Sequence, residues 1–517
     1  LAGILPTLTL QDLTMENITD LPRYRELNRT LTELRGYDFV VHIKGLDELT
    51  LTSNNMMLEA CNTSFQIHYQ ADPETFPDLY NVAQAITAPL LAAAVNSPIL
   101  FHKRLWHETR LALFERSVDE RSRAHLERER PPRVGFGDGW MRNSVMEMFH
   151  EDAARYRVIM TADADEDPAA VLSKGEIPRL SALRVHNGTV WHWNRPCYGV
   201  LRGKPHLRIE NRVMPAGPSV IDQMANAALF FGLMYEMPHA YPPIDTVMAF
   251  DHAKENFYSA ARHGLNGQFT WFGGKTVSPS DLLLKELIPL ARQGLNRAGI
   301  EATDIDRYLG VLEERVQSGI TGSQWALRSL AGQKQQNPEA SCRFLTEFML
   351  RNQRRGVPVH CWEPAQLEES DSWIDSFRRV GQFMSTDLFT VRPGDLIDLA
   401  ASIMDWEQLR HIPVEDDAGK LVGLLSHHDM LHLFASGHSA TGNPVAVRDI
   451  MKYNPVTVTP ETPTLEAINK MRECRIGCLP VVRNDRLVGI VTLIDLLKLS
   501  SKLLEKALAE ETEETHD

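Results

Sequence analysis

Cysteine is scarce in this chain, with six in 517 residues. So few cysteines exclude a disulfide-dense secreted scaffold. Paired C-x-x-C spacing, the usual sign of a structural zinc site, is also missing, because Cys474 and Cys478 stand alone. Reduced thiols are the simplest interpretation, and we therefore predict a cytoplasmic location.

A long uninterrupted apolar run is missing as well. The best stretch, residues 82–101, is broken by Gln84, Pro89, Asn96 and Pro98. A transmembrane helix needs about 20 predominantly apolar residues, so a buried helix followed by a turn fits this stretch better. We expect no membrane partner.

Positive charge is in deficit: the formal net charge is −14 and the sequence pI is about 5.8. This balance argues against non-specific binding to nucleic acids. The chain is too long for one compact core, and roughly two to four domains are expected. It opens on Leu1-Ala2-Gly3 without an initiator Met, from which we expect further residues upstream.

Residues 206–213 predict a strand whose two faces differ sharply. Leu207, Ile209 and Val213 alternate with four ionisable side chains, those of His206, Arg208, Glu210 and Arg212. Two interpretations remain open. The charged face is either a solvated outer surface or the floor of a cleft, where Glu210 holds a divalent cation and the arginines bind phosphate or carboxylate oxygens.

Residues 64–70 predict a second two-faced strand. Its polar side chains are uncharged hydrogen-bonding groups, as a ligand-facing sheet supplies, although a lone histidine in a strand is more often structural. Residues 191–196 lead through Gly199 and Gly203 into the first strand, and this layout predicts an antiparallel hairpin.

Helices are expected over residues 79–95 and 220–235 and through most of 250–365, from apolar residues at helical spacing. Two glycine-rich stretches are weak phosphate-loop candidates. Phe272-Gly273-Gly274-Lys275-Thr276 lacks the first glycine of that motif, and Gly135-Phe136-Gly137-Asp138-Gly139 has no obvious strand before it.

An internal repeat occupies the last part of the chain. His411-Ile412-Pro413-Val414 recurs 67 positions later as Cys478-Leu479-Pro480-Val481. Matching stretches precede and follow these blocks, and the last of them end at Asp429 and Asp495. A shared order of elements at a fixed period indicates duplication.

This repeat resembles a tandem pair of CBS domains, which implies two α/β repeats and a homodimer formed through them. The family's ribose–phosphate motif falls on Ser426/Asp429 and Thr492/Asp495. The resemblance implies that these residues bind an adenine nucleotide (AMP, ADP or ATP) or S-adenosylmethionine. The same spacing also describes a helix-capping arrangement, which is the alternative.

The larger part, residues 1–365, resembles glutamate–cysteine ligases, especially the plant-type branch and the related bacterial carboxylate–amine ligases. Three blocks carry the resemblance in the family's order. They are Met56-Met57 with Cys61 and Gln66, Asn96-Ser97-Pro98 followed by Arg110, and Glu210-x-Arg212 followed by the helix ending Phe231-Gly232-Leu233-Met234-Tyr235. The spacing between Cys61 and Gln66 is two residues longer here than in the family's motif.

The resemblance implies an α+β fold in which an antiparallel sheet curves into a glutamine-synthetase-like funnel. It implies a ligase that uses ATP and Mg²⁺ to phosphorylate glutamate before cysteine or another amine displaces phosphate, as in glutathione biosynthesis. Glu210 becomes a metal ligand, and Arg212 and Arg110 become catalytic. The expected substrate-binding residues are Gln66, His68, Arg195, Arg208 and Asn62.

The family's first strand, rich in metal-binding glutamates, would precede residue 1, so the chain is expected to be an incomplete enzyme. We predict a ligase-like domain at 1–365, a linker at 366–383, CBS domains at 384–440 and 451–500, and an acidic tail at 501–517. A catalytically silent, nucleotide-sensing regulator is the second interpretation.

Overall fold

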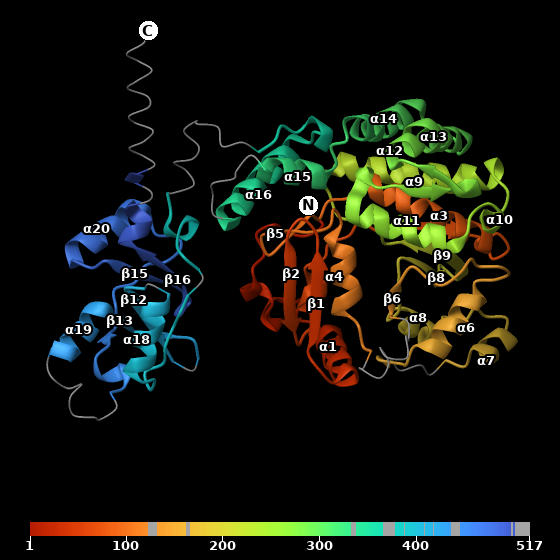
Figure 1. Cartoon of the computed structure of the whole chain (residues 1–517). Helices are drawn as coiled ribbons and strands as arrows, with labels where there is room; N and C mark the ends of the chain where they lie inside the picture. The colour runs from red at the N-terminus through yellow and green to blue at the C-terminus, as the bar shows by residue number, and fades with distance from the viewer. Residues whose placement is uncertain are drawn as a thin grey trace, which may run out of the picture. The chain divides into compact units, whose positions relative to one another are not determined.

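The computed structural model divides the chain into two compact units, Leu1–Gln366 and Leu367–Asp517, and each is described by itself (Figure 1). The residues described are 1–121, 132–161, 166–331, 338–365, 378–386, 388–407, 409–416, 418–435, 445–497 and 500–501. Most of the predicted linker and nearly all of the predicted acidic tail lie outside them. Both units combine helices and strands, which confirms a mixed α and β fold.

A three-stranded antiparallel sheet organises the N-terminal unit. Its strands are β3 (Ile67–Ala71), β9 (Lys204–Asn211) and β8 (Asn194–Leu201), in the order β3-β9-β8. The hairpin of β8 and β9 confirms the antiparallel layout predicted for these residues. The funnel itself stays a prediction.

Long helices cover the apolar face of this sheet. They are α3 (Phe76–Ala94), α9 (Val220–Ala240) and α11 (Phe250–His263), and Figure 1 shows them stacked on one side of β8 and β9. Ile67, Ala71 and Ile209 from the sheet share one buried cluster with residues of all three helices. The helices predicted at 79–95 and 220–235 are thus confirmed; α3 begins three residues earlier than predicted and ends one residue earlier, and α9 ends five residues later.

Helix α3 is buried on nearly all sides, which explains its apolar sequence without a membrane. In the part of the chain that the structure describes, no helix is long and apolar enough to cross a bilayer.

A second layer of helices packs outside the first. It contains α13 (Ile288–Arg297) and α14 (Ala302–Ser318), and α13 crosses α9 at a pair of glycines. A Cβ atom on Gly294 would lie 2.1 Å from the carbonyl oxygen of Gly232, so the two backbones touch there. The remaining helices of this region are α10 (Ile244–Val247), α12 (Pro279–Leu282), α15 (Gly322–Ala331) and α16 (Pro338–Arg355).

The other elements of this unit surround the polar face and edges of the sheet. The helices are α1 (Pro22–Arg35), α2 (Met57–Ala60), α4 (Thr109–Ser117), α6 (Met146–Arg155), α7 (Pro168–Ser173) and α8 (Ser181–Asn187). The strands are β1 (Phe39–Lys44) with β2 (Glu48–Ser53), β4 (Ile99–Leu100) with β5 (Lys103–Arg104), and β6 (Val134–Gly135) with β7 (Trp191–His192).

Both glycine-rich stretches adjoin short strands. Gly273 and Gly274 form the turn between β10 (Phe269–Trp271) and β11 (Lys275–Val277), and both have positive φ. Strand β6 ends at Gly135, so the absence of a strand before the second stretch was a wrong prediction. Strand β6 has only two residues, too few to show an alternating pattern in the sequence.

The C-terminal unit consists of two similar halves. The first contains α18 (Ile397–Trp406), β12 (His411–Glu415), β13 (Leu421–Ser426) and α19 (His427–Ala435). The second contains β14 (Lys452–Tyr453), α20 (Thr464–Cys474), β15 (Cys478–Arg483) and β16 (Arg486–Thr492).

The halves exchange short segments. Ser385, which precedes the first half, forms a bridge with Ile490 of the second, and β14 pairs with β13 of the first. Gly489 and Gly423 allow this approach, because a Cβ at either position would lie 2.5 Å from the sulfur of Met384 or Met451. Each half therefore completes the other.

Candidate functional site

The polar face of the sheet brings together residues from three strands. In the register of the sheet, Glu210 of β9 pairs with His68 of β3 on one side and with Arg195 of β8 on the other. Arg208 lies two residues earlier on the same face, opposite Gln70 and Cys197. Side chains directly opposite each other on one face of a sheet are neighbours, so this register sets the contacts of Glu210.

Glu210 is held at the centre of this group. Its Oε2 lies 2.8 Å from Nε of Arg195 and 4.0 Å from the guanidinium of Arg212, and its Oε1 lies 3.5 Å from Nε2 of His68. The carboxylate is buried, with 4% of the residue exposed. A buried carboxylate needs such partners, because an unpaired charge away from water is costly. Arg195 also donates to the carbonyl of Asn187, which fixes its position.

Arg212 follows β9 and is nearly buried without a close ion pair among the described residues. Its guanidinium lies 5.8 Å from the ring centroid of Phe114, and its nearest carboxylate is the one at 4.0 Å on Glu210. Burial, with Arg195 nearby, lowers the pKa of Arg212 to about 10. The side chain remains a cation at neutral pH, and an anionic ligand would stabilise it.

Arg208 adds a further donor to this face. Its Nε is buried and has no hydrogen-bond partner among the residues the structure describes. His68 beside it is 37% exposed, and burial together with the surrounding arginines lowers its pKa. We call Arg195, Arg208 and Arg212, together with His68 and Glu210, the cationic face. Its three arginines outnumber its one carboxylate, so it suits an anion better than a free cation.

Among the described residues, two other predicted site residues, Gln66 and Asn62, make no ion pair or hydrogen bond to Glu210. Gln66 precedes β3 and is exposed. Asn62 donates to the carbonyl of Leu58, and its Oδ1 is buried without a described partner. Neither side chain is therefore held against Glu210 by a hydrogen bond in the described part of the chain.

Arg110 is part of a buried network beneath the site. It is 2% exposed, donates through Nε to Glu108 at 3.0 Å, and also donates to the carbonyl of Val213. Glu108 in turn accepts from Ser97 at 2.7 Å and from the backbone of Asn96. The Asn-Ser-Pro turn and the downstream arginine are therefore one packed unit, which holds the chain just after Arg212.

The sequence analysis did not identify Cys197 as a site residue. It lies two residues after Arg195 on β8, so its side chain points to the same face. One ligand atom each of His68, Cys197 and Glu210 lies within 4.8 Å of the other two. Nitrogen and sulfur donors suit zinc rather than magnesium. Burial raises the pKa of the free Cys197 thiol. Because three arginines surround one carboxylate here, the arrangement favours an anionic ligand over a cation such as zinc.

The two predicted nucleotide motifs have matching geometry in the C-terminal unit. Asp495 accepts through Oδ2 from the backbone and side chain of Thr492, at 2.8 and 2.7 Å. Asp429 makes the corresponding bonds to Ser426. Both pairs adopt the capping arrangement that was the alternative interpretation, and one oxygen of each carboxylate is not used in it.

Comparisons with known proteins agree with both resemblances. The profile of glutamate-cysteine ligase family 2 matches residues 2–347, and that of the CBS domain matches residues 380–436 and 447–502. A CBS domain-containing protein of Dictyostelium discoideum is 35% identical over 135 residues, which cover 24% of this chain and 93% of that protein. An inosine-5'-monophosphate dehydrogenase of Methanocaldococcus jannaschii is 29% identical over 133 residues, but only 25% of that enzyme is covered.

Two solved structures match a similar share of the chain. CBSX2 from Arabidopsis thaliana is 28% identical, with 25% of this chain and 97% of that chain covered and a TM-score of 0.23. CBSX2 in complex with AMP is 29% identical, with 24% and 98% covered and a TM-score of 0.22. Because its family profile spans most of the sequence, the chain belongs to glutamate–cysteine ligase family 2, and it carries a pair of CBS domains.

Proposed function

We propose that the N-terminal unit is an ATP-dependent carboxylate–amine ligase that joins the γ-carboxylate of glutamate to cysteine or another amine. The observation that carries this proposal is the cationic face, where Arg195, Arg208 and Arg212 gather around one buried carboxylate. Such a face suits two anions brought together, a substrate carboxylate and a triphosphate.

In this reaction the greatest negative charge develops on the phosphoryl oxygens, and Arg208 and Arg212 are the donors proposed to bind them. The carboxylate attacks the terminal phosphorus of ATP to give an acyl phosphate and ADP. The uncharged amine then adds to the carbonyl carbon, phosphate leaves, and an amide with one fewer proton on nitrogen remains. Arg212 and Arg208, which lack close ion pairs among described residues, bind the anionic oxygens. Arg195 positions Glu210.

Glu210 can contribute one carboxylate oxygen to a magnesium site. Mg²⁺ at nucleotide sites is bound by one or two carboxylates together with phosphate oxygens and water. Oε1 of Glu210, which is not held by Arg195, is a protein oxygen that could bind it. The metal supplies charge screening between the two anions when bound. His68 is the neutral donor on the other side of that oxygen.

The CBS pair is proposed as the regulatory part of the enzyme, binding an adenine nucleotide or S-adenosylmethionine through Ser426/Asp429 and Thr492/Asp495. A homodimer through this unit is supported by its exposed apolar side chains, including Trp406 (73% exposed) and Leu465 (74% exposed). A cytoplasmic location and a part in glutathione biosynthesis go with this proposal.

The second candidate is a catalytically silent, nucleotide-sensing regulator. One experiment separates the two: ADP release by the full-length protein with ATP, Mg²⁺, glutamate and cysteine, and with other amines in place of cysteine. Release that requires both glutamate and an amine supports the ligase. Release with neither substrate indicates an ATPase, and no release with any amine tested supports the silent regulator.

A further inference from the structure

A cavity of about 400 Å³ that shares no lining residue with the cationic face lies between α6, α11 and the glycine-rich loop that follows β6. This volume falls in the range of small-molecule sites, about 300–1,000 Å³. Its walls include Phe136, Trp140 and Tyr258. Gly137 of the loop has a φ of 102°, which favours glycine, and its carbonyl accepts from Lys254 across the cavity mouth. The loop is therefore held in place by the wall opposite it.

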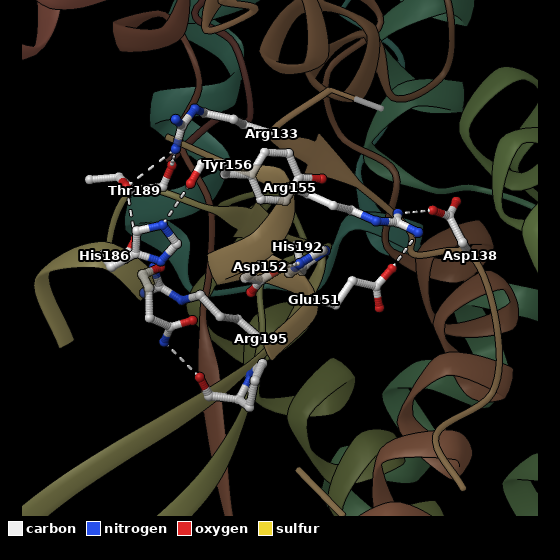
Figure 2. Close-up of polar contacts among 12 residues, drawn as sticks. Arg133, Asp138, Glu151, Asp152, Arg155, Tyr156, His186, Thr189, His192 and Arg195 are labelled. Atoms are coloured by element: carbon white, nitrogen blue, oxygen red, sulfur yellow. Dashed lines mark hydrogen bonds and ion pairs between the residues drawn. The ribbon is translucent and has the colours of Figure 1, made fainter. Parts of the chain in front are cut away.

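Carboxylates outnumber cations around this cavity. Five carboxylates line it, those of Glu115, Asp138, Glu147, Glu151 and Asp152, against the cations of Arg155 and Lys254. The two cations are already paired at the rim. Figure 2 shows Arg155 reaching to Asp138 and Glu151, and Lys254 lies 3.6 Å from Asp138. Glu147 accepts from three backbone N–H groups.

The two lining carboxylates that remain are those of Asp152 and Glu115, which we call the floor carboxylates. Asp152 is 2% exposed, and its Oδ1 lies 2.8 Å from Nε2 of His192, beside it in Figure 2. Its Oδ2 is buried and has no partner among the described residues. An acceptor left unpaired in a buried site carries an uncompensated desolvation cost. A ligand that donates to this oxygen would remove that cost.

Glu115, on α4, is the other floor carboxylate. Its Oε1 accepts from the hydroxyl of Tyr258 at 2.9 Å and from the indole of Trp193 at 3.4 Å, both neutral donors. Burial raises the pKa of Glu115, and the hydrogen bonds from Tyr258 and Trp193, with the charges of Arg116 and Lys254, oppose this shift only in part. No side-chain cation lies within ion-pair distance of either floor carboxylate among the described residues, His192 aside.

We propose that this cavity binds a small organic cation, whose ammonium group lies at the carboxylates of Asp152 and Glu115. Phe136, Trp140 and Tyr258 add aromatic side chains to the same walls, and aromatic rings attract cations. A bare metal ion does not fit, because the cavity's carboxylates do not converge as a ligand cluster: His68, Cys197 and Glu210 are the group of that kind in the described structure. The ammonium group belongs either to the acceptor amine of the proposed ligase or to an effector.

Binding is tested first, without reliance on the proposed ligase function. Calorimetry on the full-length protein compares n-butylamine and 1,4-diaminobutane with 1-butanol, which has the shape of butylamine without its charge. We expect the amines to bind and butanol not to bind. Asp152→Asn and Glu115→Gln, which keep shape and remove charge, should each weaken amine binding about tenfold or more. Asp306→Asn is the matched control, since Asp306 is exposed and outside the cavity.

Two results would overturn the proposal: butanol binding as tightly as butylamine, or amine binding unchanged in both cavity variants. The source of the amine is then resolved by activity. An acceptor is incorporated into an amide, and Asp152→Asn raises its KM without changing the KM for glutamate. An effector is not incorporated but alters the rate with another acceptor. If no ligase activity exists, the calorimetry still decides whether the cavity binds amines.

Discussion

At the scale of single residues, the cationic face shows what alternation along a strand can and cannot predict. The pattern of residues 206–213 placed Arg208, Glu210 and Arg212 on one polar face, and the structure has Arg208 and Glu210 on one face of β9. The partners of Glu210 could not be predicted, because the register that pairs it with His68 and Arg195 depends on two other strands. Cys197 was missed for the same reason.

Arg212 provides the first prediction. Arg212→Ala should lower ligase turnover about a hundredfold or more, because it removes a preorganised donor from the place where phosphoryl charge develops. The melting temperature should change little, since the described structure gives Arg212 only a 4.0 Å approach to Glu210 and a ring contact with Phe114. Turnover and thermal unfolding are measured on the same preparation. Arg116→Ala, an exposed arginine on α4, is the control, and equal turnover in the two variants would contradict the assignment.

His107 provides a pH prediction. Burial, with His263 nearby, lowers the pKa of His107 from 6.5 to about 4 in the folded chain. Between these values the unfolded chain binds a proton that the folded chain does not, so this residue's contribution to stability is full above pH 6.5. The contribution is lost as the pH falls towards 4, by up to about 3 kcal/mol.

The measurement is urea unfolding of wild type and His107→Gln at pH 7.5 and pH 4.5. The wild type should lose more unfolding free energy than the variant between these pH values, because glutamine does not titrate. Other groups titrate equally in both proteins and cancel in the comparison. An identical pH dependence in the two proteins would mean that folding does not lower the pKa of His107.

At the scale of elements, the sequence predicted the long apolar helices but not how closely they pack. Residues 220–235 have the apolar spacing of a helix, and Gly232 within them carries no helical advantage. Glycine is needed here because α9 crosses α13 at this point, and Gly294 of α13 lies against the carbonyl oxygen of Gly232. Contacts between segments some 60 residues apart are not encoded in local periodicity.

Gly294→Ala should lower the unfolding free energy by about 3 kcal/mol, because the added methyl group would lie 2.1 Å from a backbone oxygen and must separate α9 from α13. Gly310→Ala on α14 is the matched control: no atom lies within 4 Å of the added group, so helix propensity should raise stability by about 1 kcal/mol. Urea denaturation of both variants gives the two values. Similar stability changes in both would refute the backbone contact.

At the scale of the whole molecule, the duplication was the most predictable feature, because a fixed period is visible in the sequence itself. The same period relates the parallel bridges Val391–Val414 and Val458–Val481. The exchange of segments between the halves was not predictable, since it depends on where Ser385 and Lys452 lie in space. It implies that one half alone exposes unpaired backbone, whereas the pair together is complete.

A fragment of residues 378–501 should therefore fold alone and bind an adenine nucleotide or S-adenosylmethionine. Thr492 and Asp495 open the helical segment after β16, where a phosphate is favoured by the helix N-terminus. The unused oxygen of Asp495 can accept from ribose hydroxyls, so Asp495→Ala should weaken binding by about 1–3 kcal/mol, and Asp429→Ala should do the same if both clefts are used.

The loss of a helix cap must be separated from the loss of a ligand contact. Asp449→Ala serves for this, because Asp449 is exposed and accepts from the backbone of Ala446 without a nearby Ser or Thr motif. Calorimetry with AMP, ADP, ATP and S-adenosylmethionine should show weaker binding for Asp495→Ala and unchanged binding for Asp449→Ala. If none of the four binds the fragment below millimolar concentration, the two Asp residues act as caps alone, and the exposed apolar side chains of this unit leave dimerisation as its function.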